Sequence, residues 1–406
     1  MAVSLCFDYC GISPLSVEKL VKENNLKSLL NEKDAPFVKS ANTNIKEIKR
    51  KLKDYKAKFD SLIVVGMGGS SLGTKAIYNT ITSGEQEGRR KLLFFDNVDP
   101  TYVKRVLNSV NLEKTCFAFI SKSGRTLETV VLLNIVVKKL REKNFSDLGN
   151  RFIFIGDEGN SFEGLARRFD TVFFSIPKEI GGRFSVLTPV GLVPSEFINY
   201  NIEELLKGAK DALENPEPAI KLGVCKYLHY KKGRTISVMM VYSNYLREFT
   251  EWYAQLWAES LGKDGEGQTP MKAIGTSSQH SVLQLFMDGK DDKVYQFFSI
   301  ENYTEDLKLP EETEILDFIA GKKLSEIIKA EFEGTVEALY KRERPIIEIK
   351  MDSLSPYNMG YLFMIYMIAT VVMAKLMGVN PYGQPAVEIG KKLAYAKLKG
   401  GDSTSY

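Results

Sequence analysis

The chain has 406 residues, 44% hydrophobic and 26% charged, so it is long enough for two or three domains with sizeable cores. Its 55 basic and 51 acidic side chains leave a net charge of +4. This near balance argues against a general nucleic-acid binder, which would concentrate basic residues in a stripe. Four cysteines are too few for a disulfide scaffold. Cys6 and Cys10 have a metal-like spacing, but no second Cys/His pair follows them.

No targeting segment is predicted at the N-terminus, which lacks a basic region followed by an apolar run. Residues 359–374 form an uncharged apolar run, but the run is shorter than the roughly 18 to 20 residues that a membrane span needs. We therefore expect a buried or subunit-contacting helix there, and a cytoplasmic protein without a membrane partner.

Residues 1–58 are predicted to be a helical segment with a polar, Lys/Glu-rich surface. From residue 61, short β-branched or aromatic runs alternate with longer helical stretches. Continuous apolar runs of this kind are typical of parallel strands covered on both faces. They predict a first doubly wound α/β domain over residues 59–210. Its predicted strands are 61–65, 91–95, 115–120, 151–155 and 171–176.

The pattern restarts after the proline-containing residues 214–218. It predicts a second α/β domain over residues 211–378, and a closing helix (384–397) with a polar tail within residues 379–406. The predicted fold class is thus α/β, with two doubly wound parallel sheets and helical extensions at both ends. The second domain's predicted strands are 234–241, 293–300 and 345–350, with a helix at about 245–261.

A glycine- and serine-rich turn, residues 66–73, follows the first predicted strand and opens a helix. Glycines let a backbone approach a ligand closely, and helix N-terminal amides attract anions. A dinucleotide site would place glycine where Ser71 stands and an acid about 20 residues on, whereas Asp96 lies 30 residues beyond Gly66. The paired serines favour a substrate-binding turn, with a purely structural tight turn as the alternative.

A second turn, residues 121–129, also follows an apolar strand and contains four hydroxyl side chains, a lysine and a glycine. Backbone N–H groups and hydroxyls at a helix start can hold a phosphate without metal. A helix cap is the alternative, but a cap needs only one hydroxyl. A P-loop is excluded because its Gly-x4-Gly-Lys-Ser/Thr pattern is missing from the sequence.

Two further segments contain candidate charged groups. Gly181 and Gly182 present Arg183, which suits stabilisation of an oxyanion, although an arginine in a turn is more often a solvated surface residue. Gln255 and Glu259 lie on one face of a predicted helix that also contains both tryptophans. A carboxylate near aromatic rings can have a raised pKa and act as a base, with a solvated acidic stripe as the alternative.

The two histidines differ in context. His280 follows a Gly/Ser-rich loop, where reactive residues are common, whereas His229 lies in a predicted helix and is expected to be structural. Near the C-terminus, Gln384 is predicted to begin the closing helix, with Lys391 about two turns along it. In isolation, Lys391 could be a surface lysine.

Together these six segments resemble the glucose-6-phosphate isomerase (phosphoglucose isomerase) family, in the same order and over residues 63–392. The most specific pieces are Gly-Gly-Ser-Ser-Leu-Gly, Ser-Lys-Ser-Gly-x-Thr-x-Glu-Thr, Gly-Gly-Arg-Phe-Ser, Gln-His-Ser and Asn-Pro-Tyr-x-Gln-Pro-x-Val-Glu-x-Gly-Lys. The resemblance implies two sugar-isomerase (SIS) domains. Arg125, Gly383 and Ala386 depart from the family's usual residues, and none of them has an assigned chemical role.

The resemblance implies a role for each matching residue. Glu259 would be the base that moves a proton between C1 and C2, and Arg183 would stabilise the enediolate. His280, contributed by the partner subunit of a homodimer, would aid ring opening with Lys391. The implied substrate-binding residues are Gly69 and Ser70 along the sugar, Ser121, Lys122, Ser123 and Thr126 around the phosphate, and Gln255 and Gln384.

The implied reaction is the reversible isomerisation of glucose 6-phosphate and fructose 6-phosphate through a cis-enediol, as in glycolysis and gluconeogenesis. It needs a carboxylate base, a cation and a ring-opening acid, and we expect no metal, cofactor or nucleic acid. One alternative is an SIS-fold isomerase of a mannose or amino-sugar phosphate, against which the Gly-Gly-Arg and Gln-His motifs argue. Another is a regulatory sugar-phosphate-binding domain, which would not need Glu259, His280 and Lys391 together.

Overall fold

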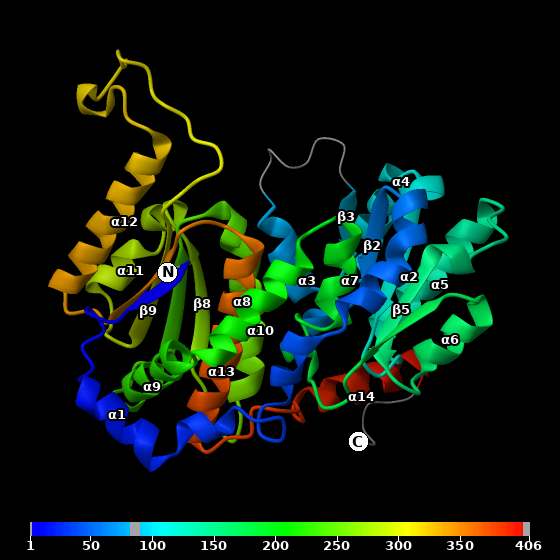
Figure 1. Ribbon diagram of the computed structural model, residues 1–406, viewed down its shortest axis with the longest axis horizontal. Helices are drawn as coiled ribbons and strands as arrows, with labels where there is room; N and C mark the ends of the chain where they lie inside the picture. The colour runs from blue at the N-terminus through cyan, green and yellow to red at the C-terminus, as the bar shows by residue number, and fades with distance from the viewer. Residues whose placement is uncertain (1, 82–89, 401–406) are drawn as a thin grey trace.

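The computed structural model describes residues 2–81 and 90–400, so the predicted polar tail at 401–406 lies outside the described residues. Two five-stranded β-sheets stand side by side, with helices on both faces of each (Figure 1). This arrangement confirms the predicted α/β fold class. The helices that flank or connect the strands include α1 (Pro14–Glu23), α6 (Ser161–Phe169) and α11 (Leu283–Asp288).

The first sheet is wholly parallel, with the strand order β3-β2-β4-β5-β6. Successive side chains of a strand point to opposite faces, so Leu62 and Val64 pack on one side and Ile63 and Val65 on the other. Both sides are buried, which explains the continuous apolar runs. The strands are β2 (Ser61–Val65), β3 (Lys91–Phe95), β4 (Thr115–Ile120), β5 (Phe152–Asp157) and β6 (Val172–Ile176).

Helices cover the two faces of the first sheet separately. One face packs on the helices α2 (Ile45–Lys58), α3 (Leu72–Asn79) and α7 (Pro189–Phe197). The other packs on α4 (Pro100–Ser109), α5 (Leu127–Glu142) and α6, around a core rich in phenylalanine.

The second sheet has the order β1-β10-β9-β7-β8, and its edge strand β1 differs from our prediction. Residues 1–58 were predicted to be helical, but Val3–Cys6 form β1, which pairs antiparallel with β10. The run is only four residues long, and its pairing partner lies far along the chain, so nothing local marks it as a strand. The other strands are β7 (Ile236–Val241), β8 (Thr269–Ile274), β9 (Lys293–Ile300) and β10 (Ile346–Met351).

Strand β8 was not predicted. It begins Thr269-Pro270, and a proline within a short run argues against a central strand because it cannot donate a ladder hydrogen bond. The proline is tolerated because β8 lies at the edge of the sheet, where it pairs only with β7.

The apolar run predicted as a buried helix is part of α13 (Pro356–Met377). By length and composition α13 could cross a membrane, but 83% of its most apolar window is buried in the protein. It packs against α8 (Ile202–Glu214), α9 (Glu217–Lys231) and α10 (Arg247–Leu261). The prediction of a buried helix is therefore confirmed. The predicted domain boundary at residues 210 and 211 lies within α8, which packs on α13.

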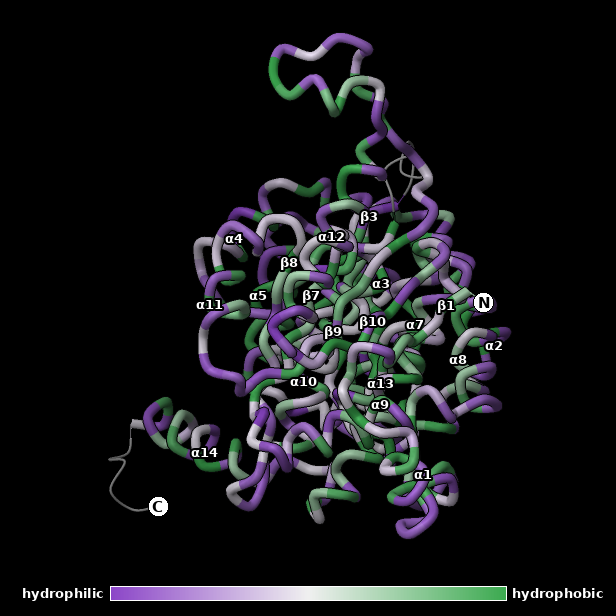
Figure 2. Tube along the Cα trace, turned by 90° about the vertical axis from the view of Figure 1, so that its left-hand side faces the viewer, coloured by the Kyte–Doolittle hydropathy of each residue, from purple (hydrophilic) through white to green (hydrophobic). Residues whose placement is uncertain are grey.

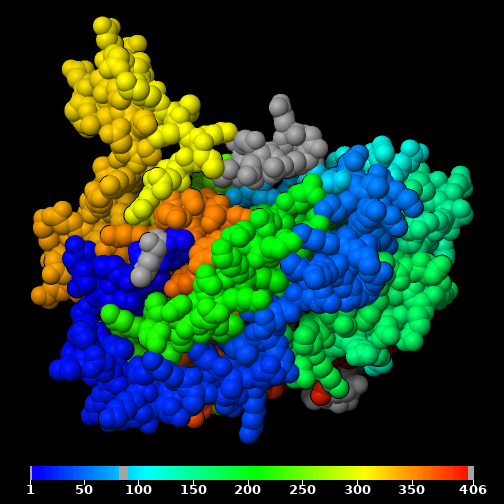
Figure 3. Space-filling model, in the orientation of Figure 1, coloured from blue at the N-terminus to red at the C-terminus, as the bar shows by residue number. Residues whose placement is uncertain are grey.

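Two peripheral segments stand away from the sheets. Residues 301–323, between β9 and α12 (Leu324–Lys341), project from the body of the molecule (Figures 1 and 3). The C-terminal helix α14 (Val387–Leu398) lies at the edge of the molecule in Figure 2. Both segments expose large apolar side chains, namely Leu307, Ile315, Leu316, Phe318, Val387, Ile389 and Leu398.

Candidate active site

The glycine-rich turn after β2 is pressed against two other parts of the chain. Gly68 has φ +53°, and a Cβ there would lie 2.7 Å from the side-chain nitrogen of Gln255. A Cβ on Gly69 would lie 2.3 Å from the carbonyl of Gly182. Both glycines are thus needed because the turn meets α10 on one side and the residue before Arg183 on the other. The turn is more than a local reversal of the chain, and it brings three of the predicted motifs together.

The Ser/Thr turn between β4 and α5 has an open helix N-terminus. Thr126 occupies the N-cap position, but its side chain makes no capping hydrogen bond. Its hydroxyl instead lies 2.8 Å from the hydroxyl of Ser121. Thr126 therefore does not cap the helix, and among the described residues no side-chain acceptor meets the first N–H groups of α5. An uncapped helix start with hydroxyls beside it is suited to an anion.

Lys122 makes two backbone contacts that the sequence does not predict. Its ammonium group donates to the carbonyl oxygens of Lys178 (2.7 Å) and Ile180 (3.0 Å). An ammonium has three donors, so one of them stays available to an anion. Lys122 thus ties the Ser/Thr turn to the segment that leads into Gly181 and Arg183. Ser123 is exposed, and its hydroxyl accepts the N–H of Arg125 at 3.2 Å.

Arg183 is the centre of the site. It lies in the short 3₁₀ turn Gly182–Phe184, and its side chain is only 3% exposed. Its guanidinium donates to Ser260 Oγ (2.8 Å), to Glu259 Oε2 (3.1 Å) and to Gln384 Oε1 (3.1 Å). Burial lowers the pKa of Arg183, although an arginine stays protonated under all ordinary conditions. The alternative that Arg183 is a solvated surface residue is therefore wrong.

Glu259 is held from two sides but stays accessible. Its Oε2 accepts from Arg183, and its Oε1 accepts from the amide of Gln255 at 3.1 Å. Its side chain is 34% exposed, so a substrate could reach the carboxylate. Trp252 and Trp257 are buried in the same helix. The face that carries Gln255 and Glu259 is consequently one wall of the site, and the aromatic face anchors α10 in the core.

Gln384 reaches the site from a loop, although it was predicted to begin the closing helix. The helix α14 begins three residues later, at Val387. Proline disfavours the helical conformation in the residue before it, and Pro385 follows Gln384 directly. The loop conformation lets the side chain of Gln384 turn to Arg183.

His280 and Lys391 are not joined to this centre. His280 ends the 3₁₀ turn Ser277–His280 and is exposed. Lys391 is 56% exposed and pairs with Glu388 at 2.7 Å. Among the described residues, no hydrogen bond or ion pair links either of them to Glu259 or Arg183. His229, in contrast, is buried and contacts the carbonyl of Cys10 at 2.9 Å, which agrees with its predicted structural role.

Two residues of the site were not predicted. Ser260 accepts a hydrogen bond from Arg183, and Lys263 donates to the carbonyl oxygens of Asn380 and Tyr382. Burial lowers the pKa of Lys263 to about 8, with the positive charge of Arg183 contributing. Their positions just after Glu259 are the only signal that the sequence offers, because their partners lie far along the chain.

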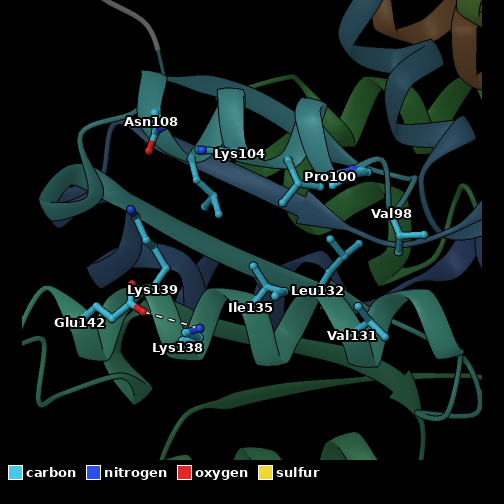
Figure 4. A pocket seen from close by; sticks show the side chains of 12 residues that line it. Val98, Pro100, Lys104, Asn108, Val131, Leu132, Ile135, Lys138, Lys139 and Glu142 are labelled. Atoms are coloured by element: carbon cyan, nitrogen blue, oxygen red, sulfur yellow. Dashed lines mark ion pairs between the residues drawn. The ribbon is translucent and has the colours of Figure 1, made fainter.

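A groove elsewhere on the surface lacks these features. It has a volume of roughly 370 Å³ and lies between α4 and α5, lined by Val131, Leu132 and Ile135 with lysines at its edge (Figure 4). Its carboxylate, Glu142, pairs with Lys138. Nothing in this groove resembles the carboxylate and guanidinium pair of the site. In the part of the chain that the structure describes, no cluster of three or more metal-ligating side chains occurs either.

Comparison with known proteins identifies the family of the chain. The family described as phosphoglucose isomerase matches residues 34–404. The chain is 38% identical to a probable glucose-6-phosphate isomerase of Methanococcus maripaludis, over 96% of this chain and 91% of that protein. Further relatives at 36% and 37% identity are named glucose-6-phosphate isomerase.

Comparison with solved structures shows similar folds in related proteins. A hypothetical protein from Thermus thermophilus superposes with a TM-score of 0.89 at 30% identity, covering 98% of this chain and 99% of that one. A glucose-6-phosphate isomerase from Chlamydia trachomatis superposes with a TM-score of 0.83 at 23% identity, covering 98% and 88%. The two sheets are thus SIS domains, and the chain belongs to the phosphoglucose isomerase family.

Proposed function

We propose that the chain interconverts glucose 6-phosphate and fructose 6-phosphate by moving a proton between C1 and C2. The family and the names of the relatives support this reaction. The observation that carries the proposal is the position of Glu259, whose two oxygens are held by Arg183 and Gln255 on a wall that substrate can reach. A carboxylate fixed in this way can accept a proton without reorganising.

The phosphate would bind at the Ser/Thr turn. Ser121, Ser123 and Thr126 supply hydroxyls, the start of α5 supplies free N–H groups, and Lys122 retains one donor. The sugar would extend from there past Gly69 and Ser70 towards α10. The close contact between Gly68 and Gln255 supports this path, since it makes the glycine turn and the wall of the site adjoin.

In the proposed reaction, His280 and Lys391 first aid the opening of the sugar ring. Glu259 then removes the proton from C2 of the aldose, and the electron pair moves to form a cis-enediol with negative charge on oxygen. Arg183 stabilises that charge. The hydroxyl proton moves from O2 to O1 of the enediolate, and the carboxylic acid of Glu259 returns its proton to C1, which yields the ketose and restores the carboxylate. The same steps run in reverse, so no outside acid, base or oxidant is consumed.

We further propose a homodimer in which His280 completes the partner's site. His280 is exposed and has no contact with Glu259 within its own chain's described residues. The exposed apolar side chains of residues 301–323 and of α14 would lose contact with water in such a dimer. We also place the enzyme in the cytoplasm, as expected of a glycolytic isomerase, with neither nucleic acid nor membrane as a partner.

A coupled assay of the purified chain tests the reaction, with fructose 6-phosphate as substrate and glucose 6-phosphate and mannose 6-phosphate followed separately. Glu259→Gln should lower kcat by about 10³-fold or more, because it removes the base. Binding of inorganic phosphate should persist in this variant. Glu251→Gln is the matched control, since Glu251 lies on the same helix but pairs with Lys272. Full turnover by Glu259→Gln, or no formation of glucose 6-phosphate by the wild type, would contradict the proposal.

A further inference from the structure

Two cations hold four successive backbone carbonyls in the segment between α13 and α14. Lys263 donates to the carbonyl oxygens of Asn380 and Tyr382, the second at 2.8 Å. Arg183 donates to those of Pro381 and Gly383, the second at 3.0 Å. The bonds alternate along residues 380–383, so each carbonyl of this segment has a charged donor. Charge-assisted hydrogen bonds are roughly twice as strong as neutral ones.

The clamped segment leads directly to two residues of the proposed mechanism. Gln384 follows it and bonds to Arg183, and α14, which carries Lys391, begins three residues later. Most of α14 is exposed, with Ala396 buried and Tyr395 donating to the carbonyl of Arg125 at 3.3 Å. Its position therefore depends strongly on the loop from which it starts.

We propose that Lys263 is a positioning residue, which together with Arg183 fixes residues 380–383 and so places Gln384 and the start of α14 in the active site. This inference rests on the proposed isomerase function, since it names a support for the same site. We assign Lys263 no contact with the substrate, because two of its three donors are directed at the backbone of this segment.

The charges around Lys263 make the clamp sensitive to alkali. Burial lowers the pKa of Lys263 to about 8; the charge of Arg183 adds to this shift, and Asp264 and Glu259 oppose it. Tyr382 on the clamped segment stays neutral in this range, since burial raises its pKa. Above pH 8 the lysine loses its charge and its bonds to the loop weaken. The clamp should accordingly loosen as the pH rises through this value.

Steady-state kinetics with fructose 6-phosphate from pH 6 to 10 test the proposal. Lys263→Met should lower kcat/KM by on the order of 10²-fold, as expected when catalytic groups move by about 1 Å. Lys263→Arg should recover most of that loss. Its alkaline decline in kcat/KM should begin more than about one pH unit higher than in the wild type, because arginine stays protonated. An alkaline limb that Lys263→Arg leaves unmoved, or normal kcat/KM in Lys263→Met, would overturn the proposal.

Hydrogen exchange of peptides covering residues 380–391 gives a readout that needs no activity. Lys263→Met should accelerate exchange in these peptides, and Lys51→Met should not. Lys51 is the matched control, because it is part-buried and donates to the carbonyl of Phe173 at 2.9 Å, on a different face of the protein. Unchanged exchange in Lys263→Met would refute the clamp. If the wild type failed to isomerise its substrate while exchange behaved as expected, the clamp would stand and the proposed reaction would fall.

Discussion

The candidate site has two parts. The side chains of the first are joined to one another within one chain, and those of the second are not. Around Arg183, side chains from a 3₁₀ turn, from α10 and from the loop before α14 are joined by hydrogen bonds of 2.8 to 3.1 Å. His280 and Lys391, in contrast, are exposed and lie outside this network. The part to which we assign proton transfer is therefore preorganised within one chain. The residues to which we assign ring opening are not joined to it, and in the proposed homodimer the partner would supply His280.

The largest effect should follow from breaking the preorganised part. Arg183→Lys keeps a positive charge but cannot reproduce donors to five partners, so kcat should fall by about 10²- to 10³-fold. Arg234→Lys is the control, because Arg234 is a shielded arginine that pairs with Asp291 away from the site. Steady-state kinetics measure kcat in both variants. Equal losses of kcat would show that Arg183 acts only through stability.

The second part of the comparison can be tested with hybrid dimers. His280→Ala should lower kcat by on the order of 10²-fold, in the usual range for a general acid or base. A purified heterodimer of one Glu259→Gln subunit and one His280→Ala subunit should regain about half of wild-type activity, because one of its two symmetric sites is intact. If His280 acted within its own chain, both sites of this heterodimer would be defective and it would stay inactive.

A smaller effect should come from separating the glycine turn from Arg183. Gly69→Ala would place a Cβ 2.3 Å from the carbonyl of Gly182, so one of the two backbones must move. We expect a loss of roughly 1 to 3 kcal/mol in the free energy of unfolding, together with a lower kcat/KM. Gly164→Ala on α6 is the control, since its Cβ would meet nothing within 4 Å and should slightly stabilise the helix. The free energy of unfolding of both variants is measured with denaturant. Equal values for the two changes would show that the contact between Gly69 and Gly182 is ordinary and unstrained.

The smallest effect concerns the support beneath α10. Lys226 is fully buried, contacts the hydroxyl of Tyr253 at 2.6 Å, and burial lowers its pKa well below 10.5. The folded state thus binds fewer protons than the unfolded state, so this residue makes stability rise with pH up to about 10.5. Relative to Lys226→Met, the wild type should gain up to about 1.4 kcal/mol per pH unit between pH 8 and 10. Parallel stability curves for the two proteins would show that Lys226 does not titrate in this way.

Much of the fold could be predicted because its strands are continuous apolar runs. The strands of the first sheet and three of the second were found from this pattern, as was the buried helix α13. Strand β1 was missed because its partner β10 is more than 300 residues away, and β8 because Pro270 obscured an edge strand. The pairing of a strand with a distant partner depends on the tertiary structure, and the local sequence pattern does not show it.

The sequence singles out side chains of the candidate site but not the bonds that they make. Residues in compact motifs, such as Arg183 and Glu259, were found, and the structure brings these two together. Lys122 was assigned to a phosphate, yet two of its donors hold backbone carbonyls. Lys263 was missed for the same reason, since carbonyl groups occur at every residue and leave no trace in the sequence. Contacts to backbone are consequently the part of a site that residue types cannot reveal.

Gly69 and Gly182 meet main chain to main chain, and this contact sets the spacing between the two turns. The glycine turn follows β2 and the Ser/Thr turn follows the neighbouring strand β4, so the proposed phosphate end of the site is anchored to one sheet. The glycine contact fixes how far Arg183, and with it Glu259, lies from that anchor. A substitution that separated Gly69 from Gly182 would therefore shift the two turns relative to each other without altering any side chain of the site.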